Sequence, residues 1–177
     1  MANIKTQRAN VSLVKRSYKN LLAMGEGING ADFRMIFEGY PDMEFLVQMT
    51  QLPGIKRETI ESKGPHGVGF KQQGNVINSD DITVTFKEVV TGKAYEFLRD
   101  VVLNKKYLDI ILSLVSETAP DGLPATSVML EDCWIEIDGT DLSVEDGTTI
   151  VKPNGTIHYN WPTWFNDASE LGAVAWE

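Results

Sequence analysis

The sequence predicts a mainly β fold: an antiparallel β-barrel or β-sandwich with one flanking α-helix and an N-terminal helical or extended arm. About seven short runs alternate apolar with polar residues or form continuous apolar blocks, as β-strands do. Turn-forming dipeptides separate these runs, and within the body only residues 92–104 place apolar side chains at helical spacing. Many short strands beside a single helix favour an antiparallel sheet that closes or folds into two layers.

The composition is that of an ordinary globular protein. The chain has 177 residues, of which 42% are hydrophobic and 23% charged, enough for one substantial core. We expect a basic arm at residues 1–30 and one β domain at residues 31–177. Cys133 is the only cysteine, which excludes an intrachain disulfide and a cysteine-built metal site. No stretch approaches the roughly 20 apolar residues of a membrane-spanning helix, and no secretion signal is apparent, so we expect a protein made in the cytoplasm.

The charge is unevenly distributed along the chain. The formal net charge is −9, yet the first twenty residues carry five basic side chains and no acid. Between Tyr107 and Val151 there are ten acids and no Lys or Arg. Proteins that grip nucleic acid need a basic surface, so this body is not expected to hold DNA or RNA. A solvated acidic face that aids solubility is the simplest interpretation.

The first element is helical and the next ones are strands. In residues 11–24 the apolar side chains recur at helical spacing, and the glycines that follow predict a flexible joint. "DFRMIFEG" and "MEFLVQMTQL", joined by "YPD", predict a hairpin, and "PGIKRETIES" predicts an extended, polar strand. In "DDITVTFKE" the apolar and polar side chains alternate between the two faces of a strand.

The second half of the chain begins with the one helix expected in the body, residues 92–104, with Thr91 as its cap. Its core-facing stripe comprises Ala94, Phe97, Leu98 and Val101. "YLDIILSLVSE" predicts a strand that is buried on both faces, and "VMLEDCWIEID" predicts another strand. Asn154-Gly155 predicts a hairpin turn, and the remaining tail is aromatic and irregular.

No motif selects a catalytic, phosphate or metal site. The glycines of "SKGPHGVGFKQQG" superficially resemble a phosphate loop, but a strand follows them rather than a Lys-Ser or Lys-Thr pair and a helix. A long flexible connection that serves something outside the subunit is the better interpretation. The histidines have no metal-ligand spacing, the cysteine is typical of a core thiol, and G-x-S-x-G is absent. We therefore expect neither an enzyme nor a cofactor.

Several of these features occur in an order that resembles a known family. The order is "FRMIFEG", then "TQLPGI" opening a polar strand, the glycine-containing stretch, "SDDITVTFKE" and the helix "AYEFLRD". It resembles the tail tube proteins of contractile-tailed bacteriophages, which are related in fold to the tubes of phage-tail-like bacteriocins and of type VI secretion. The resemblance covers roughly residues 32–102. It implies a structural protein whose hexameric rings stack into the inner tube of the tail, the conduit for genome delivery.

The resemblance also implies roles for particular residues. The glycine-containing stretch would be an inter-ring docking arm with Phe70 as an apolar anchor. Its members are Ser62, Lys63, Gly64, Pro65, His66, Gly67, Val68, Gly69, Phe70, Lys71, Gln72, Gln73 and Gly74. Polar side chains of the neighbouring strands would line the channel, and the candidates are Arg57, Thr59, Glu61, Thr83, Thr85 and Lys87.

The implied partners are further copies of the chain, the tail sheath, the baseplate and the tail terminator. Viral DNA and the tape measure protein would pass through the lumen without specific binding, because six copies at −9 each give a ring a formal charge of −54. The implied location is the virion tail, assembled in the host cytoplasm, with no cofactor and no membrane segment.

Two other interpretations stay open. Within the same class, the chain could form a bacteriocin or type VI secretion tube, and neighbouring genes would separate these from a phage. In a different class, a carbohydrate-binding β-sandwich could use Trp161 and Trp164 as a stacking platform. That interpretation predicts a stable monomer whose tryptophan fluorescence changes when glycans are added.

Overall fold

The computed structural model describes residues 11–116, 126–145 and 147–165, and the chain divides into two units, residues 1–31 and 32–177. In the first unit, α1 (Val11–Met24) is exposed along its whole length. The helix ends at a left-handed glycine, Gly25 with φ 82°, whose N–H donates to the carbonyl of Leu22. The helix predicted at these residues is confirmed. No helix in the described parts is long and apolar enough to cross a membrane.

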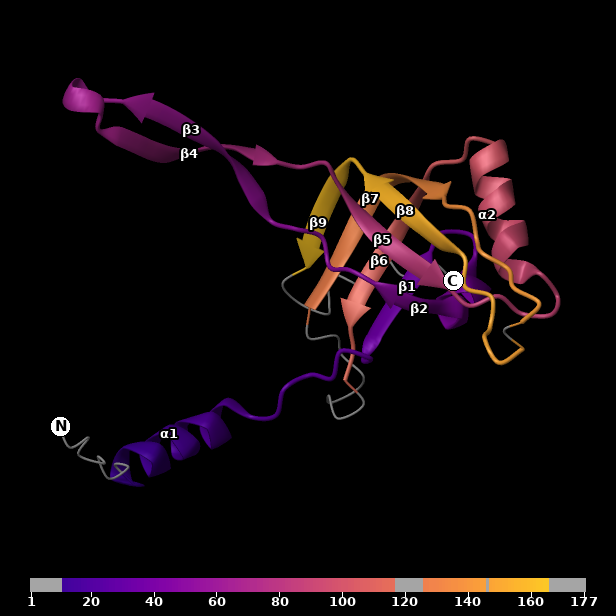
Figure 1. Cartoon of the computed structure of the whole chain (residues 1–177), viewed down its shortest axis with the longest axis horizontal. Helices are drawn as coiled ribbons and strands as arrows, with labels where there is room; N and C mark the ends of the chain where they lie inside the picture. The colour runs from indigo at the N-terminus through magenta and orange to yellow at the C-terminus, as the bar shows by residue number, and fades with distance from the viewer. Residues whose placement is uncertain (1–10, 117–125, 146, 166–177) are drawn as a thin grey trace, which may run out of the picture. The chain divides into compact units, whose positions relative to one another are not determined.

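The described part of the second unit contains nine strands, two 3-10 helices and α2 (Lys93–Leu103). The strands are β1 (Phe33–Phe37), β2 (Val47–Thr50), β3 (Lys56–Lys63), β4 (Gly69–Ile77), β5 (Asp80–Phe86), β6 (Leu108–Leu114), β7 (Thr126–Ile137), β8 (Asn154–Tyr159) and β9 (Trp161–Phe165). The 3-10 helices are η1 (Pro41–Leu46) and η2 (Pro65–Gly67). Seven strands form one antiparallel sheet in the order β1-β6-β7-β8-β5-β2, with β9 also paired to β7 (Figure 1).

β7 connects the two layers of this sheet. Its first half pairs with β6 and β9, and its last four residues pair with β8. An extra residue shifts the ladder next to Asp132, whose φ is 53°, and such a bulge bends a strand. The sheet therefore folds over itself as a sandwich, and β1 and β2 at its two ends do not close it into a barrel. The mainly β, antiparallel prediction is confirmed in its sandwich form.

The core lies between the two layers and beneath α2. Phe37 of β1, Phe86 of β5 and Phe97 of α2 meet with ring centroids 5.3 to 6.1 Å apart. The four residues predicted to form the buried stripe of the helix are all buried, and β6 is buried along nearly its whole length, as expected. Cys133 is also buried, and burial raises the pKa of its thiol, which makes it a core residue rather than a nucleophile.

The N-terminus of α2 is capped differently from the prediction. Gly92, not Thr91, occupies the N-cap position in a left-handed conformation, with no side-chain cap. The carboxylate of Glu88 accepts hydrogen bonds from the N–H groups of Ala94 (3.1 Å) and Tyr95 (2.8 Å). The cap is thus supplied from the loop before the helix. An anionic acceptor also suits the positive end of the helix dipole.

Two local hairpin predictions are wrong. Residues 33–50 do not form a hairpin, because η1 separates β1 from β2, and these strands pair instead with β6 and β5. Asn154 and Gly155 lie inside β8 rather than in a turn. Gly155 is required by packing, since a Cβ there would lie 2.5 Å from the backbone oxygen of Glu136 on β7. Glycine in a strand can mark such a close approach of two backbones.

Candidate subunit interface

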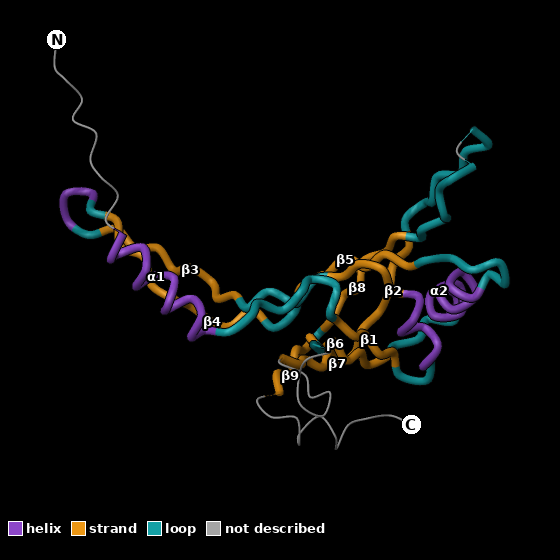
Figure 2. Tube along the Cα trace, turned by 90° about the horizontal axis from the view of Figure 1, so that it is seen from below, coloured by secondary structure: helices purple, strands orange, loops and turns teal. Residues whose placement is uncertain are grey.

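The β3–β4 hairpin is the most exposed element of the second unit. Every residue of β3 is exposed, and so is every residue of β4 except Gly74, which is half-buried. The hairpin extends away from the seven-stranded sheet (Figures 1 and 2). At its base, Lys56 forms a 2.5 Å ion pair with Asp80, which holds the pKa of that carboxyl below its usual value. A two-stranded hairpin is marginally stable by itself in water.

The glycine-containing stretch from Ser62 to Gly74 is not a flexible loop. It forms the outer half of the hairpin, with a tight tip in which the N–H of Gly64 donates to the carbonyl of Val68 at 2.8 Å. His66 (φ 60°) and Gly67 (φ 76°) supply the left-handed backbone of this tip. Gly74 has a different role, because a Cβ there would lie 3.1 Å from Glu58 and Ile60 across the hairpin.

The register gives the hairpin two unlike faces. On one face Ile60 lies opposite Gln72, Phe70 opposite Ser62, and Ile77 opposite Lys56. Ile60, Phe70 and Ile77 are all exposed, so this face carries three uncovered apolar side chains. We call it the apolar face of the hairpin.

The other face is polar over most of its length. It pairs Arg57 with Val76, Thr59 with Gln73, and Glu61 with Lys71, the last as a 2.7 Å ion pair. The three channel candidates of β3 therefore share one polar face. An element with one apolar and one polar face suits a site where one side meets protein and the other meets water.

The remaining channel candidates lie on or beyond β5. Thr83 is exposed, next to Thr156 of β8 in the register, but Thr85 is 9% exposed and offers little surface. Lys87 lies past the end of β5, where its N–H donates to the carbonyl of Leu46. The channel candidates are thus divided between the hairpin and the main sheet. Of the two threonines on β5, Thr83 is the exposed one.

A second polar feature lies on the same exposed side of β5, β8 and β7. The imidazole of His158 stacks on the indole of Trp134 with centroids 3.9 Å apart. Its Nδ1 lies 2.5 Å from Asp81, and its Nε2 lies 3.6 Å from Glu136. Side chains of three adjacent strands are therefore linked on one face, which stabilises the pairing of those strands.

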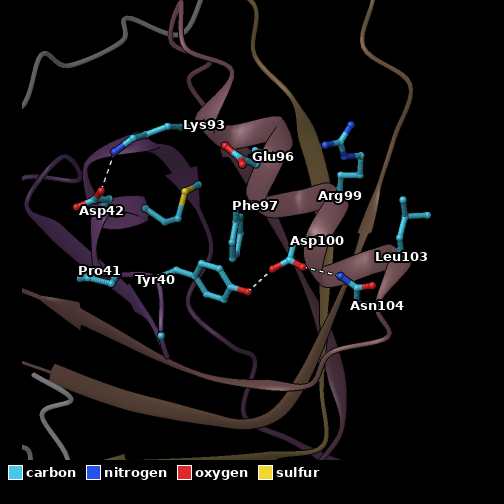
Figure 3. A pocket seen from close by; sticks show the side chains of 12 residues that line it. Tyr40, Pro41, Asp42, Lys93, Glu96, Phe97, Arg99, Asp100, Leu103 and Asn104 are labelled. Carbon is cyan, nitrogen blue, oxygen red and sulfur yellow. Dashed lines mark hydrogen bonds and ion pairs between the residues drawn. The ribbon is translucent and has the colours of Figure 1, made fainter.

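A hollow with a volume of about 580 Å³ lies between η1 and α2 (Figure 3). Tyr40 and Phe97 meet edge to face at its floor, and the hydroxyl of Tyr40 donates a 2.5 Å hydrogen bond to Asp100. Lys106 and Asn104 also donate to Asp100, and together these donors lower its pKa to about 2. A carboxylate that stays ionised down to such a low pH is a poor general acid or base near neutrality.

Within the described ranges, no group of three His, Cys, Asp or Glu side chains could hold a metal ion. The proposed sugar platform is not assembled either, because Trp161 and Trp164 are three positions apart on β9 and so point to opposite faces. Trp164 packs against the core and Trp161 is 53% exposed. Trp176 lies outside the described residues.

Comparison with solved structures identifies the fold. A chain of the sheath–tube complex of an extracellular contractile injection system, PVC, is 16% identical with a TM-score of 0.62, over 82% of this chain and 96% of that one. The tube-terminating cap of the anti-feeding prophage is 18% identical with a TM-score of 0.61, over 93% and 99%. The SPP1 tail tube is 15% identical with a TM-score of 0.52, over 85% and 87%.

No protein-family model matches the chain, and no curated protein matches it. The matched structures nevertheless agree with one another, because they come from a sheath–tube complex, a tube-terminating cap and a tail tube. The chain has a tail-tube-like fold, as the order of its sequence features indicated.

Proposed function

From this fold and the exposed amphipathic hairpin, we propose that the chain is a structural subunit that forms hexameric rings, and that these rings stack into the inner tube of a phage tail. The observation that carries the proposal is the β3–β4 hairpin, whose apolar face has no cover within the described subunit. Its apolar face packs on a subunit of the adjacent ring, and Phe70 is the anchor of that contact. A head-to-tail contact of this kind does not close, so it extends a filament.

Within a ring, the exposed sheet edges meet. β1 and β2 each pair on one side only in the described subunit, and unpaired edges readily add a further strand. Joining these edges around a ring produces a continuous inner wall. Arg57, Thr59, Glu61 and Thr83 then face an aqueous channel, while Thr85 contributes to the wall.

The tube serves as the conduit for genome delivery in the virion tail, after assembly in the host cytoplasm. Its partners are the sheath around it and the baseplate and terminator at its ends, and residues 1–30 form an arm outside the β domain. The net charge of −9 on each subunit keeps DNA from binding tightly in the lumen, through which the tape measure protein also passes. A bacteriocin or injection-system tube is the alternative within the class, and neighbouring capsid genes would identify the phage.

A tube-terminating role is a second candidate because one comparison favours it. The anti-feeding prophage cap covers 93% of this chain, more than the 82% covered by the PVC chain. A terminator forms a ring that does not elongate, whereas a tube subunit forms filaments. The two roles therefore differ in the products that the purified chain should form.

The test is deletion of residues 67–73, which removes part of the hairpin tip and the first five residues of β4 but none of the buried core. We expect a variant that unfolds with the cooperativity of the intact chain but stays in the supernatant at concentrations where the intact chain sediments as polymer. Long filaments from the deleted variant would refute the docking role of the hairpin.

A further inference from the structure

α1 has an apolar stripe that nothing in the described part of the first unit, residues 11–31, covers. Val11, Val14, Tyr18, Leu21 and Leu22 fall on one side of the helix, and all of them are exposed. An isolated helix of fourteen residues is marginal in water, so α1 needs a surface to pack on. Lys15 and Lys19 flank the stripe on one side, and Arg16 follows, with no acid anywhere in the helix. The covering surface should therefore combine apolar and acidic groups.

The loop between β7 and β8 has this combination. Leu142 and Val144 are almost fully exposed at 77% and 103%, and Ile150 is half exposed. The loop protrudes from the sheet (Figure 2). It is longer than most loops that have no secondary structure of their own, and loops of this length usually have a function. Its base is fixed, because the N–H groups of Glu88 and Phe86 donate to the carbonyls of Val151 and Pro153.

The acids of this loop distinguish it from other exposed apolar positions. Asp42 and Asp100, which neighbour exposed Phe45 and Leu103, form ion pairs with Lys93 and Lys106. None of the ion pairs found within the described residues involves the described loop acids Asp138, Asp141 and Glu145. The loop therefore offers uncompensated negative charge next to apolar side chains.

The short connection between α1 and the second unit, residues 25–31, favours docking of α1 on the β7–β8 loop of another copy. Residues 25–31 span at most about 24 Å when fully extended. They end at Asp32, whose carbonyl pairs with Val115 near the Thr126 end of β7, whereas the loop leaves the other end of that twelve-residue strand. Measured along its bent course, the strand is roughly 35 to 40 Å long. Residues 25–31 are shorter than this path, so the C-terminal turns of α1, with Leu21 and Leu22, reach this loop more readily on a second copy than on their own.

We propose that α1 of one copy docks its apolar stripe on the acidic β7–β8 loop of a second copy. Leu21 and Leu22 cover Leu142 and Val144, and the lysines of α1 face the loop acids. The contact adds a clamp between subunits to the one made by the β3–β4 hairpin. It requires two associated copies and no particular symmetry.

The test is zero-length carbodiimide cross-linking of an equal mixture of unlabelled and isotope-labelled full chains, followed by mass spectrometry. We expect amide bonds from Lys15 or Lys19 to Asp138, Asp141 or Glu145 that join one labelled and one unlabelled peptide. Cross-links only between peptides of the same label would place α1 on its own copy and overturn the proposal. So would a sample that cross-links between copies elsewhere but never through α1.

Two matched variants separate docking from bulk charge. Leu21→Asp places a charge in the apolar stripe and should lower the yield of mixed-label cross-links about tenfold, as loss of one apolar anchor would. Asn20→Asp adds the same charge on the far side of the helix and should change the yield less than about twofold. Equal losses in the two variants would refute a stripe-specific contact. Electron microscopy of the same samples shows separately whether tubes form, so a failed clamp is distinguishable from a failed tube.

Discussion

Replacing Phe70 by serine should prevent tube growth without unfolding the subunit. Phe70 lies on the apolar face of the hairpin, opposite Ser62, and is 58% exposed in the subunit. If a neighbouring subunit covers that exposed part, roughly 100 Å² at about 25 cal/mol per Å² contributes about 2.5 kcal/mol to each contact. This loss corresponds to roughly a 60-fold weaker association at each contact, so the critical concentration for growth should rise at least that much.

The assay is sedimentation of polymer over a concentration series, with urea unfolding of the soluble fraction as the check on folding. Gln73→Ser is the matched control, because Gln73 lies on the polar face of the same strand, opposite Thr59. We expect this control to polymerise like the intact chain. If Phe70→Ser grows filaments at nearly the original concentration, or if both variants lose growth equally, the assignment of the apolar face is wrong.

Three further predictions concern the subunit itself. Gly155→Ala should cost about 1 to 3 kcal/mol in unfolding free energy, because its Cβ would meet the backbone of Glu136, whereas Gly139→Ala meets open space and should be neutral. Asp100 has its pKa lowered from 3.8 to about 2, so the stability that its carboxylate contributes is present above about pH 4 and lost as the pH falls towards 2. Asp100→Asn should weaken the pH dependence of the unfolding free energy, measured by urea unfolding, over this acidic range. A variant whose unfolding free energy falls with pH as steeply as that of the intact chain would contradict this. Cys133 should react with a disulfide reagent only after unfolding, since it is buried, and rapid labelling of the native chain would contradict its position in the core.

The elements that sequence predicted well are those with strong local patterns. α1 and α2 follow from helical spacing, and β6 follows from a continuous apolar run. The pairing of β1 with β6 and of β2 with β5 could not be predicted locally, since partners far apart in sequence select it. Gly155 lies in a strand although Asn-Gly is a strong turn signal, because the close approach of β7 decides the local conformation.

The sequence singles out the glycine-containing stretch as a candidate docking segment, and its role in docking stays a prediction. The strand β4 is not predictable from the sequence, because glycines and glutamines give a weak strand pattern. The available signal for this strand is an alternation, in which Gly69, Lys71 and Gln73 fall on one side and Phe70 and Gln72 on the other. This alternation assigns the residues to the two faces of the hairpin only when the partner strand β3 and the register shift between Arg57 and Thr59 are known.

The central claim, that this chain builds a tube, is tested most directly by electron microscopy of the purified, untagged protein over a range of concentrations. The account predicts hollow filaments of stacked six-fold rings that lengthen as the concentration rises. Isolated rings that never stack would indicate a terminator instead of a tube subunit. Monomers that persist at the highest concentration would contradict the account.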